Sequence, residues 1–342
     1  MTAPLTLPVL LTGITGFIAK RIALDLLEAG YAVRGSLRSP AREAEVRAAL
    51  TAHLSDPALL DRLSFVTLDL AEDDGWQDAL AGTQALVHTA SPFPMVQPKD
   101  EEAIIRPAVD GALRAMAAAQ AAGVTRVVLT SSVVAIEACD KGPGQAFSEA
   151  DWSDPAHPLS NAYYKSKTLA ERAAWAFVEK HPEMQLSTIN PSLVLGAPLD
   201  AQYGTSLQLI ERILRGKDPM LPDIGFGIVD VADVSAAHLA ALANPDAAGR
   251  RFIASSGSAT MPEIGRYLAE RHASRRIPTR AAPRIVLQVL SLFDPSIRTV
   301  LPGLGRLAQF DASAAERDLG VSFAPWQDAV GRAADAVLAQ MD

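Results

Sequence analysis

Two side chains that can exchange a proton stand four positions apart in the segment Asn161 to Glu171. Tyr163 and Lys167 fall on one face if this segment is helical. A tyrosine titrates near pH ~10, and a neighbouring ammonium favours the phenolate and brings the pKa toward the working range. Such a Tyr-x-x-x-Lys spacing arises by chance in roughly one chain of this composition in ten, so it needs support from other motifs. We predict that both residues are catalytic. Tyr164 has Thr168 at i+4, so it lacks a lysine partner and is predicted to belong to the pocket wall or to the packing.

A hydroxyl group that could assist them follows the apolar run Val127 to Leu129. Ser132 lies just beyond this predicted strand, at the edge where open α/β proteins bind ligands. There it can donate to a carbonyl oxygen that is becoming an alkoxide. The alternative is that Ser132 only caps the next segment. It is not an esterase nucleophile, because the Gly-x-Ser-x-Gly elbow is absent. The histidines lack ligand-like spacing, His88 is expected to be structural, and no metal is predicted.

A glycine turn follows the first apolar run, Val9 to Thr12. The residues Gly13 to Ala19 have the spacing Gly-x-x-Gly-x-x-Ala and open a predicted helix. Glycines let the backbone approach a pyrophosphate, and the helix N-terminus favours its charge. A plain tight turn is the alternative. The order strand, glycines, helix, strand favours a dinucleotide site, whose predicted contacts are Gly13, Thr15, Gly16, Phe17 and Ile18.

The end of the second predicted strand indicates which dinucleotide binds. No acidic residue precedes Glu43 there to hold a ribose 2′-hydroxyl. Arg38 and Arg42 instead offer planar forks suited to a 2′-phosphate, so the predicted cofactor is NADP(H). The alternative is that both arginines are merely solvated. Asp69 could accept from an adenine amino group or cap a helix.

The elements that would position these residues alternate between short apolar runs and longer helical patterns. Strands are predicted at Val9–Thr12, Ala32–Leu37, Phe65–Leu68, Ala85–Thr89, Arg126–Ser131 and Leu186–Asn190. Helices are predicted at about Phe17–Ala29, Ala41–Leu54, Ile104–Ala122, Tyr163–Glu179, Val231–Ala243 and Trp326–Gln340. This alternation predicts an α/β fold with a Rossmann-type, doubly wound parallel sheet.

The alternation of strands and helices ends after Pro191, which predicts a smaller C-terminal substrate-binding lobe. We expect residues 1–190, with about 228–256, to form the NADP-binding domain. The expected lobe comprises 191–227 and 257–342.

Composition narrows the class of partner. The 342 residues are 49% hydrophobic and carry a net charge of −8, the wrong sign for tracking a phosphate backbone or anionic lipid. The longest later apolar stretch, Ile285 to Phe293, is about half of what a membrane helix needs. We therefore expect a cytoplasmic protein without nucleic-acid or membrane partners. The one cysteine, Cys139, excludes an internal disulfide.

Taken together, these motifs resemble the extended short-chain dehydrogenases/reductases. Within them, the chain is similar to the branch of dihydroflavonol reductases, cinnamoyl-CoA reductases and fungal methylglyoxal-type ketoreductases. The resemblance rests on Thr12 to Ala19, Val87 to Phe93, Arg126 to Ser132, Tyr163 to Glu171, Asn190 to Gly196 and Val229 to Val234. It implies Ser132, Tyr163 and Lys167 as the catalytic triad and Arg38 as the 2′-phosphate contact. It also implies cofactor contacts at Asp69, Leu70, Thr89, Ala90, Ser91, Pro191, Ser192 and Leu193.

Two positions depart from that pattern. Asp110 stands where the family's long helix often carries an asparagine. The asparagine that would support a proton relay is therefore absent at this position. Glu137 stands where plant dihydroflavonol reductases are expected to carry a ring-binding asparagine. Flavonoid reduction is therefore disfavoured, and a general carbonyl reductase is the better class.

The predicted function is NADPH-dependent reduction of an aldehyde or ketone to an alcohol. A nucleotide-sugar epimerase or dehydratase is one alternative, with basic groups at Arg250, Arg251, Arg275 and Arg276 for a diphosphate. A hydroxysteroid dehydrogenase and a non-catalytic NADP-binding redox sensor are the others. The resemblance leaves monomer and homodimer both open. Candidate substrate contacts are Phe93, Val133, Tyr164, Tyr203, Leu207, Met220 and Phe226.

Overall fold

The main sheet is built from parallel strands in the order of a dinucleotide-binding fold. The computed structural model describes residues 7–91, 100–142, 144–293, 297 and 300–341. Within these ranges the sheet has seven strands, in the order β3-β2-β1-β4-β5-β6-β9. They are β3 (Leu63–Thr67), β2 (Val33–Leu37), β1 (Val9–Thr12), β4 (Ala85–His88), β5 (Arg126–Thr130), β6 (Gln185–Pro191) and β9 (Arg250–Ala254). The first six strands of this order are the doubly wound order 3-2-1-4-5-6. The predicted fold class is confirmed.

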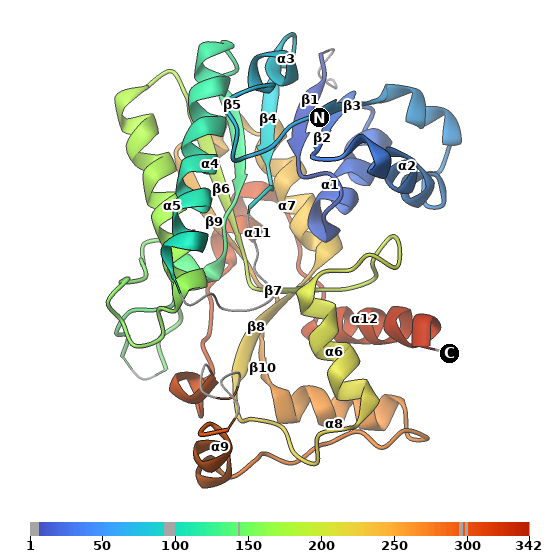
Figure 1. Cartoon of the computed structure of the whole chain (residues 1–342), viewed down its shortest axis with the longest axis vertical. Coiled ribbons are helices and arrows are strands. Elements are labelled where there is room, and N and C mark those ends of the chain that lie inside the picture. The colour runs from blue at the N-terminus through green and yellow to red at the C-terminus, as the bar shows by residue number, and fades with distance from the viewer. Residues whose placement is uncertain (1–6, 92–99, 143, 294–296, 298–299, 342) are drawn as a thin grey trace.

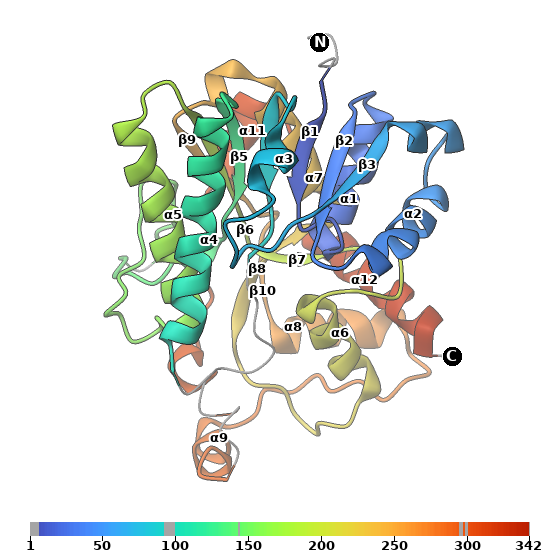
Figure 2. The ribbon, with the colours of Figure 1, turned by 45° about the horizontal axis from the view of Figure 1, so that its top comes forward.

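Helices cover both faces of this sheet (Figures 1 and 2). Alternate strand residues explain why: Val9 and Leu11 join one apolar core, whereas Leu10 between them joins another. The first core includes residues of α1 (Phe17–Glu28), α2 (Glu43–Thr51), α7 (Val231–Ala243) and α11 (Ser313–Leu319). The second includes residues of α3 (Trp76–Leu80), α4 (Glu102–Ala121) and α5 (Ala162–Lys180). Strands buried on both faces read as continuous apolar runs, which is why the sequence revealed them.

The predicted strands and helices of this half agree with the structure to within a few residues, but β9 and the two short helices α3 and α11 were missed. Two arginines begin β9, and a strand that opens on charges does not show the apolar run that marks its neighbours. Arg250 pairs with Asp318 and Arg251 with Glu171, so both charges are compensated by partners distant in the sequence.

A second layer packs beyond the carboxyl ends of the main strands (Figure 1). Its sheet comprises β7 (Leu193–Leu195), β8 (Gly225–Asp230) and β10 (Ser258–Thr260), in the order β10-β8-β7. Around a shared apolar core lie α6 (Thr205–Arg215), α8 (Met261–Arg271) and α12 (Trp326–Met341). The helix α9 (Arg284–Leu290) lies at one extremity of the molecule. Short 3-10 turns occupy Pro40–Arg42, Pro57–Arg62, Val133–Ala135, Pro245–Ala247 and Leu301–Gly303.

The chain passes between the two layers several times. After β6 it enters the second layer through β7 and α6, and β8 then leads directly into α7 on the main sheet. The carboxyl ends of the main strands therefore face the second layer, which is where open α/β folds bind ligands. Among the described residues, none of the helices has the length and apolarity to cross a membrane.

Candidate active site

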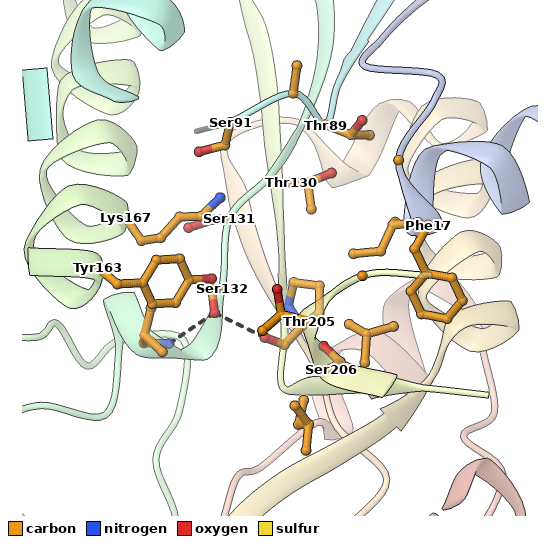
Figure 3. A pocket seen from close by; sticks show the side chains of 18 of the residues that line it. Phe17, Thr89, Ser91, Thr130, Ser131, Ser132, Tyr163, Lys167, Thr205 and Ser206 are labelled. Carbon is orange, nitrogen blue, oxygen red and sulfur yellow. Dashed lines mark hydrogen bonds between the residues drawn. The ribbon is translucent and has the colours of Figure 1, made fainter. Parts of the chain in front are cut away.

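A cavity of about 1130 Å³ lies at the carboxyl edge of the main sheet, between the two layers. Residues from the ends of β1, β2, β4, β5 and β6 line one side, and residues at the start of α6 and in β8 line the other. Figure 3 shows Thr205 and Ser206 facing it from α6, with Tyr163 and Lys167 reaching in from α5. The cavity therefore joins the glycine turn to the predicted catalytic residues.

The glycine turn forms the floor at one end of this cavity. Gly13 has φ of +69°, and a Cβ there would stand 3.0 Å from the Cβ of Ala90. The Gly13 amide donates to Ser36 Oγ at 3.1 Å, which fixes the turn against β2. The helix α1 begins without a side-chain cap and without an acidic residue in its first turn. Its N-terminal amides and positive dipole end thus suit a pyrophosphate.

A threonine holds β1 and β4 together beside that turn. Thr12 Oγ1 accepts from the amides of Thr89 (3.1 Å) and Ala90 (3.2 Å) and is hydrogen-bonded to His88 Nδ1 at 2.9 Å. Burial, with a smaller contribution from the nearby Lys167 charge, lowers the pKa of His88 to about 4. His88 is therefore neutral at pH 7 and has a structural role.

Of the two arginines predicted to contact a 2′-phosphate, only one lines the cavity. Arg38 is exposed and lines the cavity near Leu37 and Asp69. Arg42 is not among the lining residues, because its guanidinium forms a fork with the Glu45 carboxylate at 2.7 and 3.0 Å. Asp69 lines the cavity while one of its oxygens accepts from the Ala71 amide at 3.0 Å. Asp69 does not cap a helix, because the next helix, α3, begins at Trp76 with Gly75 at its N-cap, so the capping alternative is wrong. Its place in the cavity lining is compatible with an adenine contact.

The start of α5 fixes the two residues predicted to exchange protons. Asn161 caps this helix, with its Oδ1 accepting from the amides of Tyr163 (3.0 Å) and Tyr164 (3.1 Å). The cap sets the helical phase, so that Tyr163 and Lys167 both line the cavity, one turn apart. Capping by asparagine is a signal that the sequence carries, although we had placed the helix start one residue later.

Ser132 lies directly opposite this helix (Figure 3). Its hydroxyl is hydrogen-bonded to the Tyr163 phenol. It also accepts from the Val134 amide at 3.3 Å and donates to the Pro191 carbonyl at 3.4 Å. The serine therefore caps the 3-10 turn Val133–Ala135 and touches Tyr163 at the same time.

The expected electrostatic effect of Lys167 on Tyr163 is not what the structure gives. Burial raises the pKa of Tyr163 to about 12, and the hydrogen bond with Ser132 offsets only part of that rise. Burial also lowers the pKa of Lys167 to about 8, against an opposing contribution from Glu171. Desolvation disfavours both charged forms and dominates here. Tyr163 is thus a neutral phenol at pH 7, able to donate a proton.

Glu137, which stands where related reductases are expected to carry a ring-binding asparagine, lines the same cavity together with Tyr164 and Arg306. The Tyr164 hydroxyl donates to Glu137 Oε1 at 2.7 Å, and Arg306 lies close enough to act on both groups electrostatically. Burial raises the pKa of Glu137. Arg306 comes from a segment without regular structure, so no periodicity pointed to it. Asp110, by contrast, is exposed and is not among the lining residues.

The structure brings together most of the predicted cofactor contacts. Those that line the cavity are Gly13, Thr15, Gly16, Phe17, Ile18, Arg38, Asp69, Leu70, Thr89, Ala90, Ser91, Tyr163, Lys167, Pro191, Ser192 and Leu193. They surround one continuous space that is bordered by the uncapped helix and by Arg38. The site therefore fits an extended dinucleotide whose phosphates approach α1.

The predicted substrate contacts divide into two groups. Val133, Tyr164 and Phe226 line the cavity. Tyr203 packs against the core of the second layer, with its hydroxyl donating to Glu211 at 3.3 Å, and Leu207 is fully buried in that core. Met220 is not among the lining residues either, and Phe93 lies outside the described residues.

Metal chemistry has no cluster of ligands in the described ranges. Within them, His, Cys, Asp and Glu side chains form no group of three or more that could hold an ion.

Comparison with known proteins identifies the family. Residues 9–254 match the model of the NAD dependent epimerase/dehydratase family. The chain is 30% identical to an anthocyanidin reductase ((2S)-flavan-3-ol-forming) of Vitis vinifera over 282 residues, which cover 78% of this chain and 81% of that protein. It is 34% identical to a cinnamoyl-CoA reductase of Medicago truncatula over 281 residues, which cover 80% and 83%.

Solved structures agree. Yeast methylglyoxal/isovaleraldehyde reductase Gre2, crystallised as a complex with NADPH, superposes with a TM-score of 0.80 at 26% identity, covering 98% of this chain and 99% of that one. These findings confirm the predicted class, an NAD(P)-dependent oxidoreductase. With its doubly wound sheet and its cavity between glycine turn, serine, tyrosine and lysine, the chain belongs to the NAD-dependent epimerase/dehydratase family, the extended short-chain dehydrogenases/reductases.

Proposed function

We propose that the protein reduces an aldehyde or ketone to an alcohol with NADPH as the hydride donor. The observation that carries this proposal is the convergence of Ser132, Tyr163 and Lys167 in the cavity that the uncapped N-terminus of α1 borders. The reductases among its relatives, and the NADPH complex of yeast Gre2, support the same reaction class.

The residues of the chain have distinct roles in this proposal. The turn Gly13 to Ile18 and the N-terminus of α1 would hold the pyrophosphate, and Arg38 the 2′-phosphate. Bound NADPH supplies the hydride that the reaction needs. Lys167 would hydrogen-bond the ribose hydroxyls and hold positive charge close to the reacting carbonyl.

Proton delivery falls to the serine and tyrosine pair. Ser132 and Tyr163 would both donate hydrogen bonds to the substrate oxygen, where negative charge develops. Tyr163 then gives its proton to that oxygen. Because burial raises the pKa of Tyr163 to about 12, the phenol is protonated at neutral pH and ready for the reductive direction.

The substrate end of the cavity favours a small to medium carbonyl compound. Val133 and Phe226 offer apolar surface, and the pair of Tyr164 and Glu137 offers a polar edge beside Arg306. None of the four arginines suggested for a nucleotide diphosphate, Arg250, Arg251, Arg275 and Arg276, lines the cavity, and two of them have acidic partners, Arg250 in Asp318 and Arg251 in Glu171. This argues against the epimerase alternative.

Oxidation of NADPH at 340 nm in the presence of aldehydes, ketones, diketones and a dihydroflavonol tests the proposal, with NADH in parallel. The expected result is turnover with NADPH on at least one carbonyl compound and a drop of about a thousandfold in kcat/KM in Tyr163→Phe. Tyr267→Phe, in the second layer beside Trp326, is the matched control and should retain full activity. Tight NADPH binding without turnover on any compound would favour the redox-sensor alternative instead.

A further inference from the structure

A buried carboxylate lies behind the catalytic residues. Glu171 is one turn beyond Lys167 on α5 and is 1% exposed. It accepts from Arg251 Nε at 2.7 Å, from Ser131 Oγ at 2.5 Å and from Asn190 Nδ2 at 2.8 Å. These donors come from β9, from the end of β5 and from β6, so one carboxylate joins three strands to the helix that carries Tyr163 and Lys167.

Two of these hydrogen bonds lead directly to Ser132. Ser131 precedes it in the chain, and Asn190 Nδ2 also donates to the Ser132 carbonyl at 3.2 Å. Thr188, two residues before Asn190, donates to Glu171 Oε1 at 3.1 Å, as does Trp175 Nε1 at 3.3 Å. The main-chain position of Ser132 is therefore set on both sides by groups bonded to Glu171.

The charge of Glu171 is compensated on the side away from the cavity. The side chain of Arg251 is 8% exposed, and its guanidinium lies 3.7 Å from the centre of the Trp152 ring. The same guanidinium donates to the carbonyls of Glu149 and Asp151, both at 2.7 Å. The additional hydrogen bonds of this buried ion pair help to offset the cost of desolvating its two charges.

The ionisable groups around Lys167 come from two elements. Tyr163 and Glu171 each lie one turn from it on its own helix, the Tyr163 phenol being neutral at pH 7, and His88 faces it from β4. Burial lowers the pKa of His88 to about 4, so at pH 7 the histidine adds no charge. Glu171 is then the charged neighbour that favours the protonated amine of Lys167.

We propose that Glu171 is a positioning residue for proton transfer, which fixes Ser132 through Ser131 and Asn190 and holds a negative charge beside Lys167. This inference rests on the proposed function and deepens it. Glu171 would act together with Ser132, Tyr163 and Lys167, but unlike them it would contact neither substrate nor cofactor.

Two replacements of Glu171 separate the effect of its charge from that of its shape. Glutamine keeps the shape and removes the charge, whereas aspartate keeps the charge on a shorter side chain. The pH at which Lys167 becomes reactive toward an amine-acylating reagent can be followed by peptide mass spectrometry, whether or not the protein turns over. In Glu171→Gln the midpoint should fall by about one pH unit, because an opposite charge near the amine is lost. In Glu171→Asp it should stay near that of the unaltered protein. Glu179→Gln, two turns along the same helix, is the charge-matched control and should not move the midpoint.

Activity provides the second reading. The alkaline limb of the kcat/KM profile should shift to lower pH in Glu171→Gln and not in Glu171→Asp. An unchanged Lys167 midpoint in Glu171→Gln would overturn the charge role. If the unaltered protein reduces no carbonyl compound, the proposed function fails, while the labelling experiment still decides whether Glu171 controls Lys167.

A milder variant covers the case in which Glu171→Gln does not fold. Ser131→Ala removes one hydrogen bond to Glu171, and Ser187→Ala removes one of similar length to the Ala247 carbonyl from the strand next to it. We expect kcat to fall about tenfold in Ser131→Ala, with the KM for NADPH unchanged, and to stay within twofold in Ser187→Ala. Equal behaviour of the two variants would overturn the positioning role.

Discussion

At the scale of single residues, desolvation decides the chemistry of this site. Tyr163 and Lys167 stand where their spacing suggests mutual activation, yet burial moves the pKa of the phenol up to about 12 and that of the amine down to about 8. A phenol that stays protonated suits proton donation. The spacing of the pair was visible in the sequence, but the direction of each shift depends on how deeply the fold buries it.

In the proposed function, the preference for NADPH over NADH depends on one arginine. Arg38 lines the cavity, whereas Arg42 is engaged with Glu45. We predict that Arg38→Leu weakens NADPH binding at least tenfold, because a charge-assisted hydrogen bond to the 2′-phosphate is lost, and leaves NADH binding unchanged. Titration calorimetry with both cofactors measures this. Arg42→Leu is the matched variant and should retain the preference. Equal losses in the two variants would contradict the placement of Arg38.

At the scale of elements, a turn and a helix cap position the residues to which we assign cofactor binding and catalysis. The glycine turn after β1 brings the backbone against β4, and Asn161 sets the phase of α5. A left-handed φ and a close approach coincide at Gly13, whereas Gly82 has a similar φ of +66° in open space. A comparison of these two glycines therefore separates the cost of a left-handed backbone from the cost of a steric clash.

Alanine at these two glycines should therefore act differently. Gly82→Ala should lower the free energy of unfolding by about 1 to 2 kcal/mol, the cost of a left-handed alanine. Gly13→Ala should lower it further, because its Cβ would meet the Cβ of Ala90 at 3.0 Å, and should also weaken NADPH binding. Urea denaturation and cofactor titration measure both. Equal destabilisation and unchanged binding would show that the close approach at Gly13 is unimportant.

A buried histidine joins β5 to α7 and makes this contact sensitive to pH. His238 Nε2 is hydrogen-bonded to Thr130 Oγ1 at 2.7 Å, and burial lowers the pKa of the histidine to about 4. Between about pH 6.5 and 4 the unfolded chain therefore binds a proton that the folded chain excludes, so stability falls as the pH falls. For a pKa shift of this size, the total decrease in the free energy of unfolding is about 3 kcal/mol. Unfolding of His238→Gln should depend less on pH over this range. Parallel curves for the two proteins would contradict the assignment.

At the scale of the whole molecule, an ion pair links the main sheet's helix α1 to the loop that leads into the second-layer wall of the cavity. Lys20 on α1 is 1% exposed and is paired with Asp200, which belongs to the loop between β7 and α6. Glu45 lies 3.8 Å from the same amine. The loop then leads to Gly204, Thr205 and Ser206, which line the cavity. A buried charge pair therefore holds one wall of the site.

Removing the acidic partner should be costly. Asp200→Asn leaves the Lys20 ammonium without its closest counter-charge, and we expect a loss of about 3 kcal/mol in the free energy of unfolding. The double variant Lys20→Met, Asp200→Asn should recover most of it, because no charge then remains buried. Urea denaturation measures both proteins. A double variant as unstable as the single one would contradict this account.

The sequence revealed the main sheet and missed most of the second layer. Parallel strands covered on both faces, such as Val127 to Leu129, are apolar along their whole length and stand out. The helix α6 has apolar residues Leu207, Ile210 and Leu214 at helical spacing, but glycines and prolines around it hid the pattern. Tyr203 was predicted to line the pocket from its type alone. Which way it points depends on packing between elements that the sequence does not place.

In the candidate site, too, one part can be predicted from the sequence and another part cannot. Its cofactor end follows from one turn with a local sequence signature. Glu137 and Arg306 meet from segments 169 residues apart, and Glu171 collects donors from three strands. Contacts of this kind depend on tertiary structure.

The most direct test of the central claim follows the hydride itself. NADPH carrying deuterium at the transferred position is incubated with a carbonyl compound found in the activity screen, and the alcohol product is analysed by NMR. The account predicts deuterium on the former carbonyl carbon, formed by the unaltered protein and by Tyr267→Phe but about a thousandfold more slowly by Tyr163→Phe and Ser132→Ala. Product without deuterium, or equal rates in all four proteins, would contradict reduction at this cavity.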